Sequence, residues 1–171
     1  MPAAQPETFT LDRIETPIGT ALVVTDGDGV LRAFNWTDYE PQMLAWIAKR
    51  YPKVSLVEGE GPLRAAFAAY FAGQVDAFED VAWEGVGTAF QRRVWQELCA
   101  IPAGETISYA TLAQRIGRPT AVRAVGLANG SNPVALIVPC HRVIGSNGSL
   151  TGYGGGLHRK RWLLQHEGVQ G

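Results

Sequence analysis

A short glycine-containing joint at residues 84–87 divides this 171-residue chain into two parts whose sequence patterns differ. Three stretches rich in β-branched and aromatic residues precede the joint, at 8–14, 20–25 and 30–35. Turn-forming sequences at 17–19 and 26–29 separate these stretches. Short strand-like segments joined by such turns predict a β-meander.

Two helices are expected to follow the meander. The first spans 41–50, and the second spans 62–71 and stops at Gly73, because glycine readily adopts the conformation that ends a helix. The acidic residues here are scattered and match no catalytic pattern, as expected of a solvated surface. Residues 1–84 are therefore predicted to form a small α/β scaffold domain.

The second part of the chain opens with a helix start signal of the capping-box form, from Thr88 to Gln91. In this arrangement the two side chains satisfy backbone groups that the first helical turn leaves unpaired. Apolar residues then recur at helical spacing, and Cys99, next to that face, is expected to be a small buried residue. Residues 88–171 are predicted to form a second domain.

Two short helices and a tight turn are predicted in the middle of the second part. Ser108 is a suitable cap for a helix at 109–116, which ends at Gly117-Arg118-Pro119. Thr120 is a suitable cap for the next helix, which runs through Ala128. This is the outline of a DNA-binding helix-turn-helix, although ordinary helical hairpins share it.

The second of these helices carries one charge, Arg123, among very small side chains that include Ala124 and Gly126. A helix that reads the major groove usually presents several long polar side chains, whereas small ones permit approach to a minor groove only about 6 Å wide. The lone arginine could then enter the base stack and hold a vacated position. The alternative is that small residues merely pack this helix against its neighbour.

The strongest chemical signal is Pro139-Cys140-His141-Arg142, to which a short apolar strand at 137–138 is expected to lead. The thiolate is the nucleophilic form of cysteine, and adjacent basic or cationic groups such as His141 and Arg142 lower the pKa of a thiol. Residues adjacent in sequence rarely point side by side, so a bridging water could carry the proton between sulfur and imidazole. The alternative is a core cysteine beside unrelated surface charges.

A glycine-rich loop and a final helix follow the cysteine. The loop at 151–156 can bring backbone donors close to a ligand, and Tyr153 offers a flat face for a base. The helix is predicted over 157–167. Glu167 lies near its C-terminal end, where the helix dipole disfavours a negative charge, which indicates a specific partner such as His141 or a buried backbone group.

The charges are distributed unevenly along the chain. Residues 1–87 carry six Lys and Arg against thirteen Asp and Glu, whereas 88–171 carry nine against three. A basic part beside an acidic one indicates contact with a polyanion, although chance clustering of surface charge gives the same counts. The candidate phosphate contacts are Arg92, Arg93, Arg115, Arg118 and the cluster Arg159-Lys160-Arg161.

Composition narrows the class of protein. Apolar residues make up 46% of the chain, enough for a packed core, and no apolar run approaches the roughly 20 residues that span a bilayer. The N-terminus lacks the pattern of a signal peptide, so we expect a cytoplasmic protein that does not contact membranes. Two cysteines are too few for a disulfide framework, and the Cys and His spacings match no usual zinc pattern.

The sequence around the cysteine, Pro139-Cys140-His141-Arg142-Val143, resembles the signature of the methylated-DNA–protein-cysteine methyltransferases, also called O6-alkylguanine-DNA alkyltransferases. Four further motifs carry the resemblance: Ile107-Ser108-Tyr109, Arg123-Ala124-Val125-Gly126, Asn132-Pro133 and Leu163-Leu164-Gln165-His166-Glu167-Gly168. Together they cover essentially all of 88–171. The first part resembles the family more loosely, most like its bacterial Ogt-type members.

The resemblance implies that Cys140 is the alkyl acceptor. His141, a water and Glu167 would form the relay that generates the thiolate, and Asn132 would brace the turn that holds the site. Tyr109 would donate a proton or a hydrogen bond to N3 of the base, so that guanine leaves as a neutral species.

The resemblance also implies how the damaged base is held. The backbone carbonyls of Cys140 and Val143 would accept the exocyclic amine, Tyr153 would pack on the flipped base, and the backbone around Gly154 would bond to O6. Arg123 would replace the extruded nucleotide, because O6 cannot be reached inside a stacked duplex. The other expected base- and DNA-binding residues are Ala124, Gly126 and Arg142.

The implied fold is α/β: a small ribonuclease H-like N-terminal domain and a mainly helical C-terminal domain with a helix-turn-helix. No cofactor is expected, and no metal, because residues 1–87 lack the Cys and His residues through which some members bind zinc. The expected partner is double-stranded DNA with O6-alkylguanine or O4-alkylthymine, bound by a monomer; cooperative binding stays open. A thioether product is not reversed by thiol exchange or water, so each molecule should react once.

Two other functions compete with direct repair. A non-catalytic sensor of alkyl lesions would bind DNA and recruit other proteins, but relatives of that kind lack the cysteine that this chain has. A Cys-His hydrolase would normally bring its histidine from a distant part of the chain, and no third orienting residue follows a hydrolase pattern here.

Overall fold

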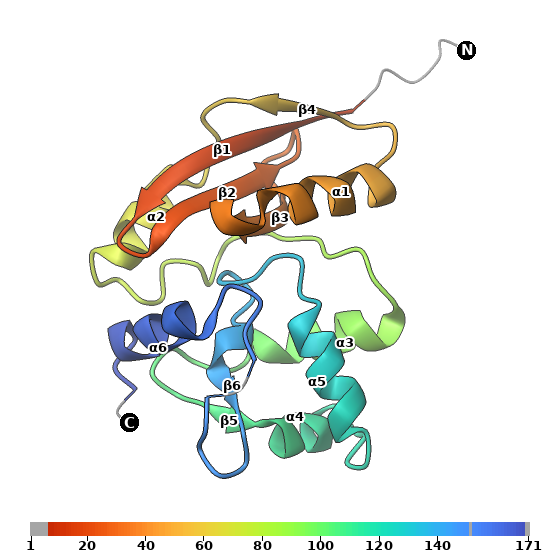
Figure 1. Cartoon of the computed structure of the whole chain (residues 1–171), viewed down its shortest axis with the longest axis vertical. Coiled ribbons are helices and arrows are strands. Elements are labelled where there is room, and N and C mark those ends of the chain that lie inside the picture. Colours follow the sequence, from red (N-terminus) through yellow and green to blue (C-terminus); the bar gives the residue numbers. More distant parts are fainter. Residues whose placement is uncertain (1–6, 151, 170–171) are drawn as a thin grey trace.

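The computed structural model describes residues 7–150 and 152–169 and has a β-sheet at one end and a group of helices at the other (Figure 1). The strand order in the sheet is β3-β2-β1-β4. The strands are β1 (Thr8–Thr16), β2 (Gly19–Thr25), β3 (Leu31–Trp36) and β4 (Ser55–Glu58). The first three pair antiparallel and confirm the predicted meander, whereas β4, which pairs with β1 in parallel, was not predicted.

Both faces of the sheet are buried, because alternate side chains of β2 enter two different clusters. One face packs on α1 (Glu40–Arg50), which confirms the helix predicted at 41–50. This cluster contains Phe9, Leu11, Leu22, Val24, Ala33, Met43 and Ile47. The other face, through Val23 and Phe34, packs with α2 (Arg64–Phe71) and with the helical end of the molecule.

The helical end contains α3 (Ala89–Leu98), α4 (Tyr109–Arg115), α5 (Val122–Gly130) and α6 (Leu157–His166). The predicted capping box is present, since Thr88 Oγ1 accepts from the Gln91 backbone at 3.1 Å and Gln91 Oε1 accepts from the Thr88 backbone at 2.9 Å. Ser108 caps α4 by accepting a hydrogen bond from Thr111 N at 3.0 Å, also as predicted. These caps fix where both helices begin.

Two secondary-structure predictions for this end were wrong. Thr120 does not cap α5: the cap position is Ala121, whose backbone N–H donates to Arg118 O at 2.9 Å and so closes a turn. Residues 137–138 do not form a strand but belong to a turn in which Leu136 adopts a positive φ of 72°. A short 3-10 helix, η2 (Cys140–Arg142), follows and leads into β6 (Val143–Ile144). This strand pairs in parallel with β5 (Ile107–Ser108).

The joint at 84–87 packs directly on Trp95 of α3. A methyl group added at Gly87 or Gly85 would stand 2.6 or 2.9 Å from the indole ring, so only glycine lets the backbone pass. The indole N–H donates to Ala128 O of α5 at 2.8 Å. A backbone bond from Phe34 N to Pro133 O, 2.9 Å long, ties the sheet to the segment that precedes the cysteine.

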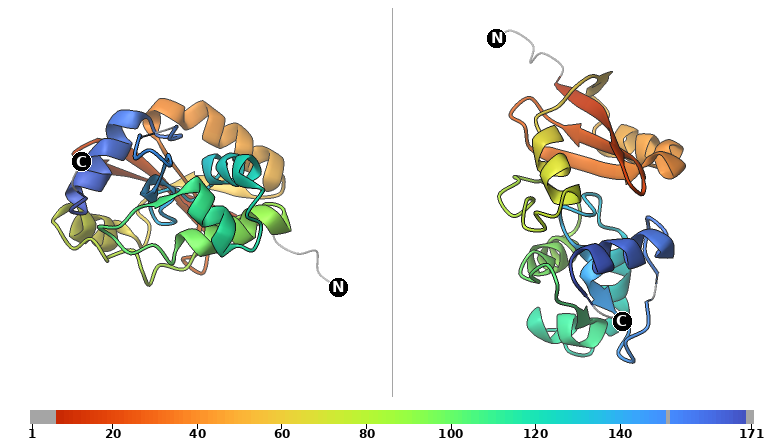
Figure 2. Two further views of the ribbon diagram at one scale, coloured as in Figure 1. Left: turned by 90° about the horizontal axis from the view of Figure 1, so that it is seen from below. Right: turned by 90° about the vertical axis from the view of Figure 1, so that its left-hand side faces the viewer.

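The two ends of the molecule share one core. A single cluster of buried side chains includes Phe34 and Phe67 from the sheet end and Trp95 and Leu112 from the helical end. The right-hand view of Figure 2 shows the sheet, with α1 and α2, above the helices α3 to α6. The segment after α5 reaches up between these two parts. Among the described residues, no helix is long and apolar enough to cross a membrane.

Candidate active site

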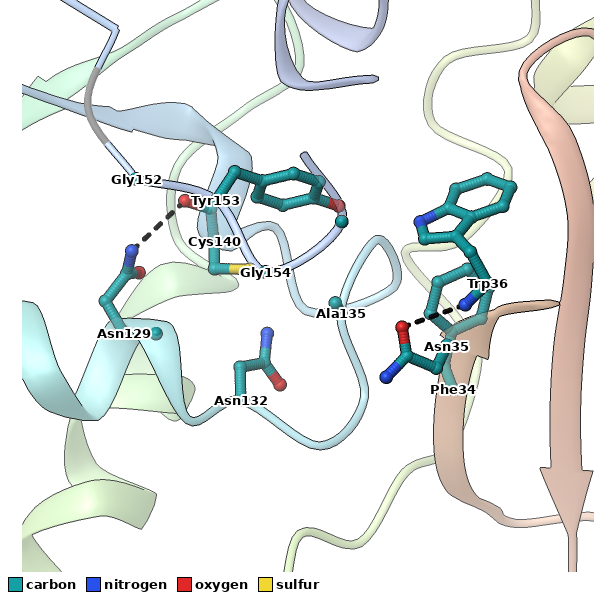
Figure 3. Close-up of a pocket in the computed structure, with 12 residues that line it drawn as sticks. Phe34, Asn35, Trp36, Asn129, Asn132, Ala135, Cys140, Gly152, Tyr153 and Gly154 are labelled. Carbon is teal, nitrogen blue, oxygen red and sulfur yellow. Dashed lines mark hydrogen bonds between the residues drawn. The ribbon is translucent and has the colours of Figure 1, made fainter. Parts of the chain in front are cut away.

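Cys140 lines a cavity of about 90 Å³ where the sheet end meets the helical end (Figure 3). Four residues expected from the sequence line it: Asn132, Cys140, Tyr153 and Gly154. The other lining residues are Phe34, Asn35, Trp36, Asn129, Gly130, Ala135, Gly152 and Gly155. The wall formed by the end of β3 was not predicted, because nothing local in its sequence indicates that it faces a cysteine a hundred residues later.

Asn132 holds the turn that leads to the cysteine. Its side-chain N–H donates to Val138 O at 2.8 Å, and its side-chain oxygen accepts from Val134 N at 3.0 Å. Both ends of this amide are therefore used to close one loop. These contacts are the ones expected of a residue that braces the turn.

The thiol of Cys140 is less acidic than the sequence predicts. Burial raises its pKa to about 11, and the opposing effects of Asn132 and of the Lys160 charge do not overcome it. His141 and Arg142 were expected to lower this pKa, but both side chains bond to Glu167 instead and do not have that effect. In the free protein the sulfur is therefore a protonated thiol at neutral pH.

His141 and Glu167 form a fully buried pair, with 2.8 Å between His141 Nε2 and Glu167 Oε2. Burial would raise the pKa of Glu167, but His141 and Arg142 together lower it to about 2, so the carboxylate is ionised. An ionised carboxylate only accepts hydrogen bonds, so Nε2 must carry the proton. Burial lowers the pKa of His141, which makes the imidazole neutral and leaves Nδ1 as a basic nitrogen.

That basic nitrogen has no hydrogen-bond partner among the described residues, although it is buried. The other ring nitrogen of His141, Nε2, is held by Glu167, so the orientation of the imidazole is fixed while Nδ1 stays available. A buried polar atom without a partner is unusual and points to a water or a proton that arrives during function.

Glu167 has two further partners. Arg142 donates to Oε1 at 2.8 Å through Nε and to Oε2 at 3.1 Å through Nη2, and its remaining nitrogen donates to Ile101 O at 2.7 Å. Tyr70 of α2 donates its hydroxyl to Oε2 at 2.6 Å. The suggestion that Glu167 has a partner in His141 is thus correct, but Tyr70 was missed because it lies 97 residues earlier in the chain.

Arg159 and Lys160 are buried and bonded within the protein, against the expectation that they contact phosphate, whereas Arg161 is exposed. Lys160 Nζ donates to Val143 O at 2.7 Å, and burial lowers the pKa of its ammonium group to about 8. The backbone oxygen of Cys140 likewise accepts from Asn129 Nδ2, at 3.3 Å. The Cys140 oxygen also accepts from the backbone N–H of Val143, so both of its lone pairs are already in use.

Three of the residues expected to meet DNA, Arg123, Ala124 and Gly126, lie on α5 and outside the cavity lining. Arg123 and Ala124 are exposed, and Leu127 on the same helix exposes 71% of its surface. Gly126 is half-buried: a methyl group there would stand 3.8 Å from the ring of Tyr109 at the start of α4. The helix thus has a packed side and a bare, nearly uncharged side.

Cys99 is exposed, against the expectation that it is buried. It lies just after the last residue of α3, and its thiol contacts Trp95 O at 3.6 Å. It therefore serves as an internal reference for the chemistry of Cys140.

In DNA-free protein, the alkylation rate of Cys140 by iodoacetamide should rise about tenfold per pH unit from about pH 7 to about pH 10. The reason is that burial raises the pKa of this thiol to about 11, so the thiolate fraction grows throughout that range. Mass spectrometry of the Cys140 and Cys99 peptides would follow both thiols in one sample. A plateau in the alkylation rate near neutral pH would mean that the thiol is already ionised there and would contradict this expectation.

Comparison with known proteins shows the same relatives for both ends of the chain. The family model described as "6-O-methylguanine DNA methyltransferase, DNA binding domain" matches residues 89–169. The methylated-DNA–protein-cysteine methyltransferase of Salmonella typhimurium is 47% identical over 162 residues, which cover 92% of this chain and 94% of that protein.

Solved structures agree with the sequence comparison. The crystal structure of Mycobacterium tuberculosis O6-methylguanine methyltransferase superposes with a TM-score of 0.78 at 43% identity, covering 94% of this chain and 93% of that one. The structure of Mycobacterium tuberculosis OGT in complex with DNA gives a TM-score of 0.71 at 40% identity, over 93% and 92% of the two chains. This chain belongs to the methylated-DNA–protein-cysteine methyltransferase family.

Proposed function

We propose that this protein repairs alkylated DNA directly, by moving an alkyl group from O6 of guanine, or O4 of thymine, onto Sγ of Cys140. One observation carries the proposal: a cysteine that lines a small cavity is followed by a buried histidine with one nitrogen on an ionised carboxylate and the other unpaired. This is the arrangement of a nucleophile beside an oriented general base.

The bond changes follow from this arrangement. Sγ attacks the alkyl carbon, a C–S bond forms, the C–O6 bond breaks, and its electron pair stays with the base. The thiol proton passes through a water to Nδ1 of His141, and Tyr109 gives its phenolic proton to N3 of the departing guanine. The proton on His141 then returns to Tyr109 through water, which restores both side chains. The number of protons is therefore conserved, and guanine leaves as a neutral molecule. The thioether is stable, so the protein acts once.

The raised pKa of Cys140 fits a protein that is consumed by its own reaction. A buried thiol with a pKa of about 11 is mostly protonated in the cell and reacts little with stray electrophiles. Proton transfer to His141 and the nearby charge of Lys160 favour the thiolate once a base fills the cavity. The reactive form is then made where it is used.

We also propose how the protein engages duplex DNA. Residues 1–84 form a ribonuclease H-like domain, and 88–171 form a DNA-binding domain in which α4 and α5 are the helix-turn-helix. The bare side of α5 lies in the minor groove, and Arg123 fills the gap left by the flipped nucleotide. The related Mycobacterium tuberculosis protein solved with DNA supports DNA as the partner. A cytoplasmic monomer, cooperative or not on DNA, suffices for this mechanism.

The test is intact-protein and peptide mass spectrometry after incubation with a duplex that contains one O6-methylguanine. We expect one added methyl group per protein, located on the Cys140 peptide and absent from the Cys99 peptide. The variant Cys99→Ala should react normally. Lesion binding without a mass gain would support a sensor, and sustained turnover of a small ester would support a hydrolase; either result would overturn the proposal.

Arg123→Ala should lower the transfer rate from duplex DNA by about tenfold or more, because base flipping costs a few kcal/mol that an inserted side chain offsets. Transfer from free O6-benzylguanine should not change, since no duplex has to be opened. Arg161→Ala removes an exposed charge from α6 and serves as the matched control. Equal losses in both variants would indicate that Arg123 contributes only general attraction to phosphate.

A further inference from the structure

The end of β3 forms one wall of the cavity. Figure 3 shows Trp36 across the cavity from Cys140, with the nitrogen of its indole directed toward the side where Tyr153 lies. The thiol points into the space between them. The sheet end of the molecule therefore shapes the part of the cavity that an alkyl group would enter.

Trp36 and Tyr153 bring two polar hydrogens to this space, and at least one of them has no acceptor. Trp36 Nε1 and the hydroxyl of Tyr153 are both buried, and neither has a hydrogen-bond partner of acceptable geometry among the described residues. Burial raises the pKa of Tyr153 well above 10, and the nearby indole offsets this only in part, so the phenol keeps its proton. The two groups hold two donor hydrogens but only one acceptor oxygen. Even if they bond to each other, one donor hydrogen remains unpaired.

Arg159 holds Trp36 in this position. Its guanidinium lies 4.6 Å from the centre of the indole ring, and it donates to Asp38 at 2.7 and 3.1 Å. It also donates to Ile18 O and to Gly155 O, both at 2.9 Å. The indole is thus fixed by a buried cation that is itself fixed by four contacts, so the N–H cannot turn away to find another partner.

Close packing with the loop completes this wall. A methyl group added at Gly155 would stand 2.8 Å from Trp36 Nε1 and 2.7 Å from the ring of Tyr153. The indole N–H therefore has no room on that side for a protein side chain. Apart from the Tyr153 hydroxyl, a partner has to come from the cavity.

These contacts define the chemistry of the group that would fit. Water can satisfy the spare donor while the cavity is empty, but an alkyl group displaces that water. An apolar group then leaves the donor buried and unpaired, whereas a group that carries an oxygen restores the bond. Arg159 is already neutralised by Asp38, so the wall offers no spare charge and suits a neutral acceptor rather than an anion.

We propose that Trp36, together with Tyr153, selects O6-alkyl groups that carry a neutral hydrogen-bond acceptor, such as 2-hydroxyethyl, over apolar groups of the same size. The inference rests on the proposed function, because it assumes that the alkyl group reacts at Cys140. Sγ attacks the carbon bonded to O6, as before, and the acceptor oxygen on the next carbon takes no part in bond making. It receives the hydrogen bond in the reactant and keeps it in the thioether.

The experiment compares duplexes that contain O6-methylguanine, O6-propylguanine or O6-(2-hydroxyethyl)guanine. Propyl and 2-hydroxyethyl have the same number of heavy atoms, so the ratio of their transfer rates reports on the oxygen. We expect this ratio, hydroxyethyl over propyl, to fall about tenfold in Trp36→Phe, the effect of one lost hydrogen bond in a buried site. Trp46→Phe, which removes a half-buried indole from α1, should leave the ratio unchanged.

The outcomes separate this inference from the proposed function. Methyl transfer by the unmodified protein tests the function alone. Methyl transfer with the same hydroxyethyl-to-propyl ratio in Trp36→Phe would overturn the role of Trp36 and leave the function intact. Because the ratio is taken within one protein, a general loss of activity in the variant cancels.

A second measurement avoids the variant if it does not fold. The unmodified protein is reacted to completion with each duplex, and the indole N–H resonance of Trp36 is recorded by NMR. A hydrogen bond to the transferred group should move this resonance downfield in the S-hydroxyethyl product relative to the S-propyl product. Identical positions in both products would overturn the proposal.

Discussion

Cys140→Ser is expected to abolish alkyl transfer while the protein stays folded and binds lesion-containing DNA. The hydroxyl is smaller than the thiol and fits the same place, but it is a far weaker nucleophile at neutral pH, so the rate should fall by at least about 10⁴-fold. The hydrogen bonds of Glu167 to Tyr70, His141 and Arg142 do not involve the Cys140 side chain, so the buried network should survive.

Two assays on Cys140→Ser check this expectation. Intact mass after incubation with O6-methylguanine duplex should show no added methyl group, and fluorescence anisotropy should show lesion binding close to that of the unmodified protein. Cys99→Ser is the matched control, because it makes the same change at an exposed cysteine. Transfer to any other residue in Cys140→Ser would place the acceptor elsewhere and contradict the assignment.

The features that the sequence predicts well are those decided by neighbouring residues. The capping box at Thr88, the cap at Ser108 and the three strands of the meander follow from side chains within a few positions of each other. The turn chemistry that separates the strands is equally local. The motif around Cys140 belongs to this class too, which is why the proposed acceptor residue can be named without a structure.

The sequence does not predict the parts of the site that depend on contacts between distant segments. Tyr70 lies on a helix with no chemical signature, and only folding brings its hydroxyl to Glu167. Lys160 looks like part of a surface cluster, yet it is completely buried and bonded to the backbone of Val143. The acidity of Cys140 also depends on burial, which outweighs the effect expected from basic neighbours in the sequence.

These distant contacts give the sheet end a direct part in the chemistry. It contributes Tyr70 to the carboxylate that orients His141, and it contributes Trp36 to the wall of the cavity. A shared core across the two ends keeps these side chains in place. The acidic half of the chain is therefore part of the site, although it carries none of the motifs that identify the family.

Glu167→Gln is expected to destabilise the protein and to slow transfer together. The carboxylate accepts hydrogen bonds from Tyr70, His141 and Arg142, and an amide can accept at only one of its two ends. Removing one partner of a buried charge pair costs about 3–5 kcal/mol, which for a chain of this size lowers the melting temperature by about 10 °C.

The rate should fall because the imidazole loses the group that fixes its tautomer. With an ionised Glu167, Nε2 of His141 carries the proton and Nδ1 is free to act as the base. A glutamine N–H next to Nε2 would favour the opposite tautomer, so transfer should slow by about 100-fold or more. Tyr70→Phe is the control, since it removes one hydrogen bond to the carboxylate, costs about 1 kcal/mol and leaves the His141 pair intact.

The dependence of stability on pH tells this effect apart from a simple packing defect. The pKa of Glu167 falls from 4.5 when unfolded to about 2 when folded, so its contribution is complete above the unfolded value and is lost as the pH falls through the folded one. Glu167→Gln lacks this contribution. Urea unfolding should therefore show a stability gap between the two proteins that is wide at neutral pH and narrows between pH 4.5 and about 2. A gap that stays constant across that range would mean that the charge of Glu167 does not stabilise the fold.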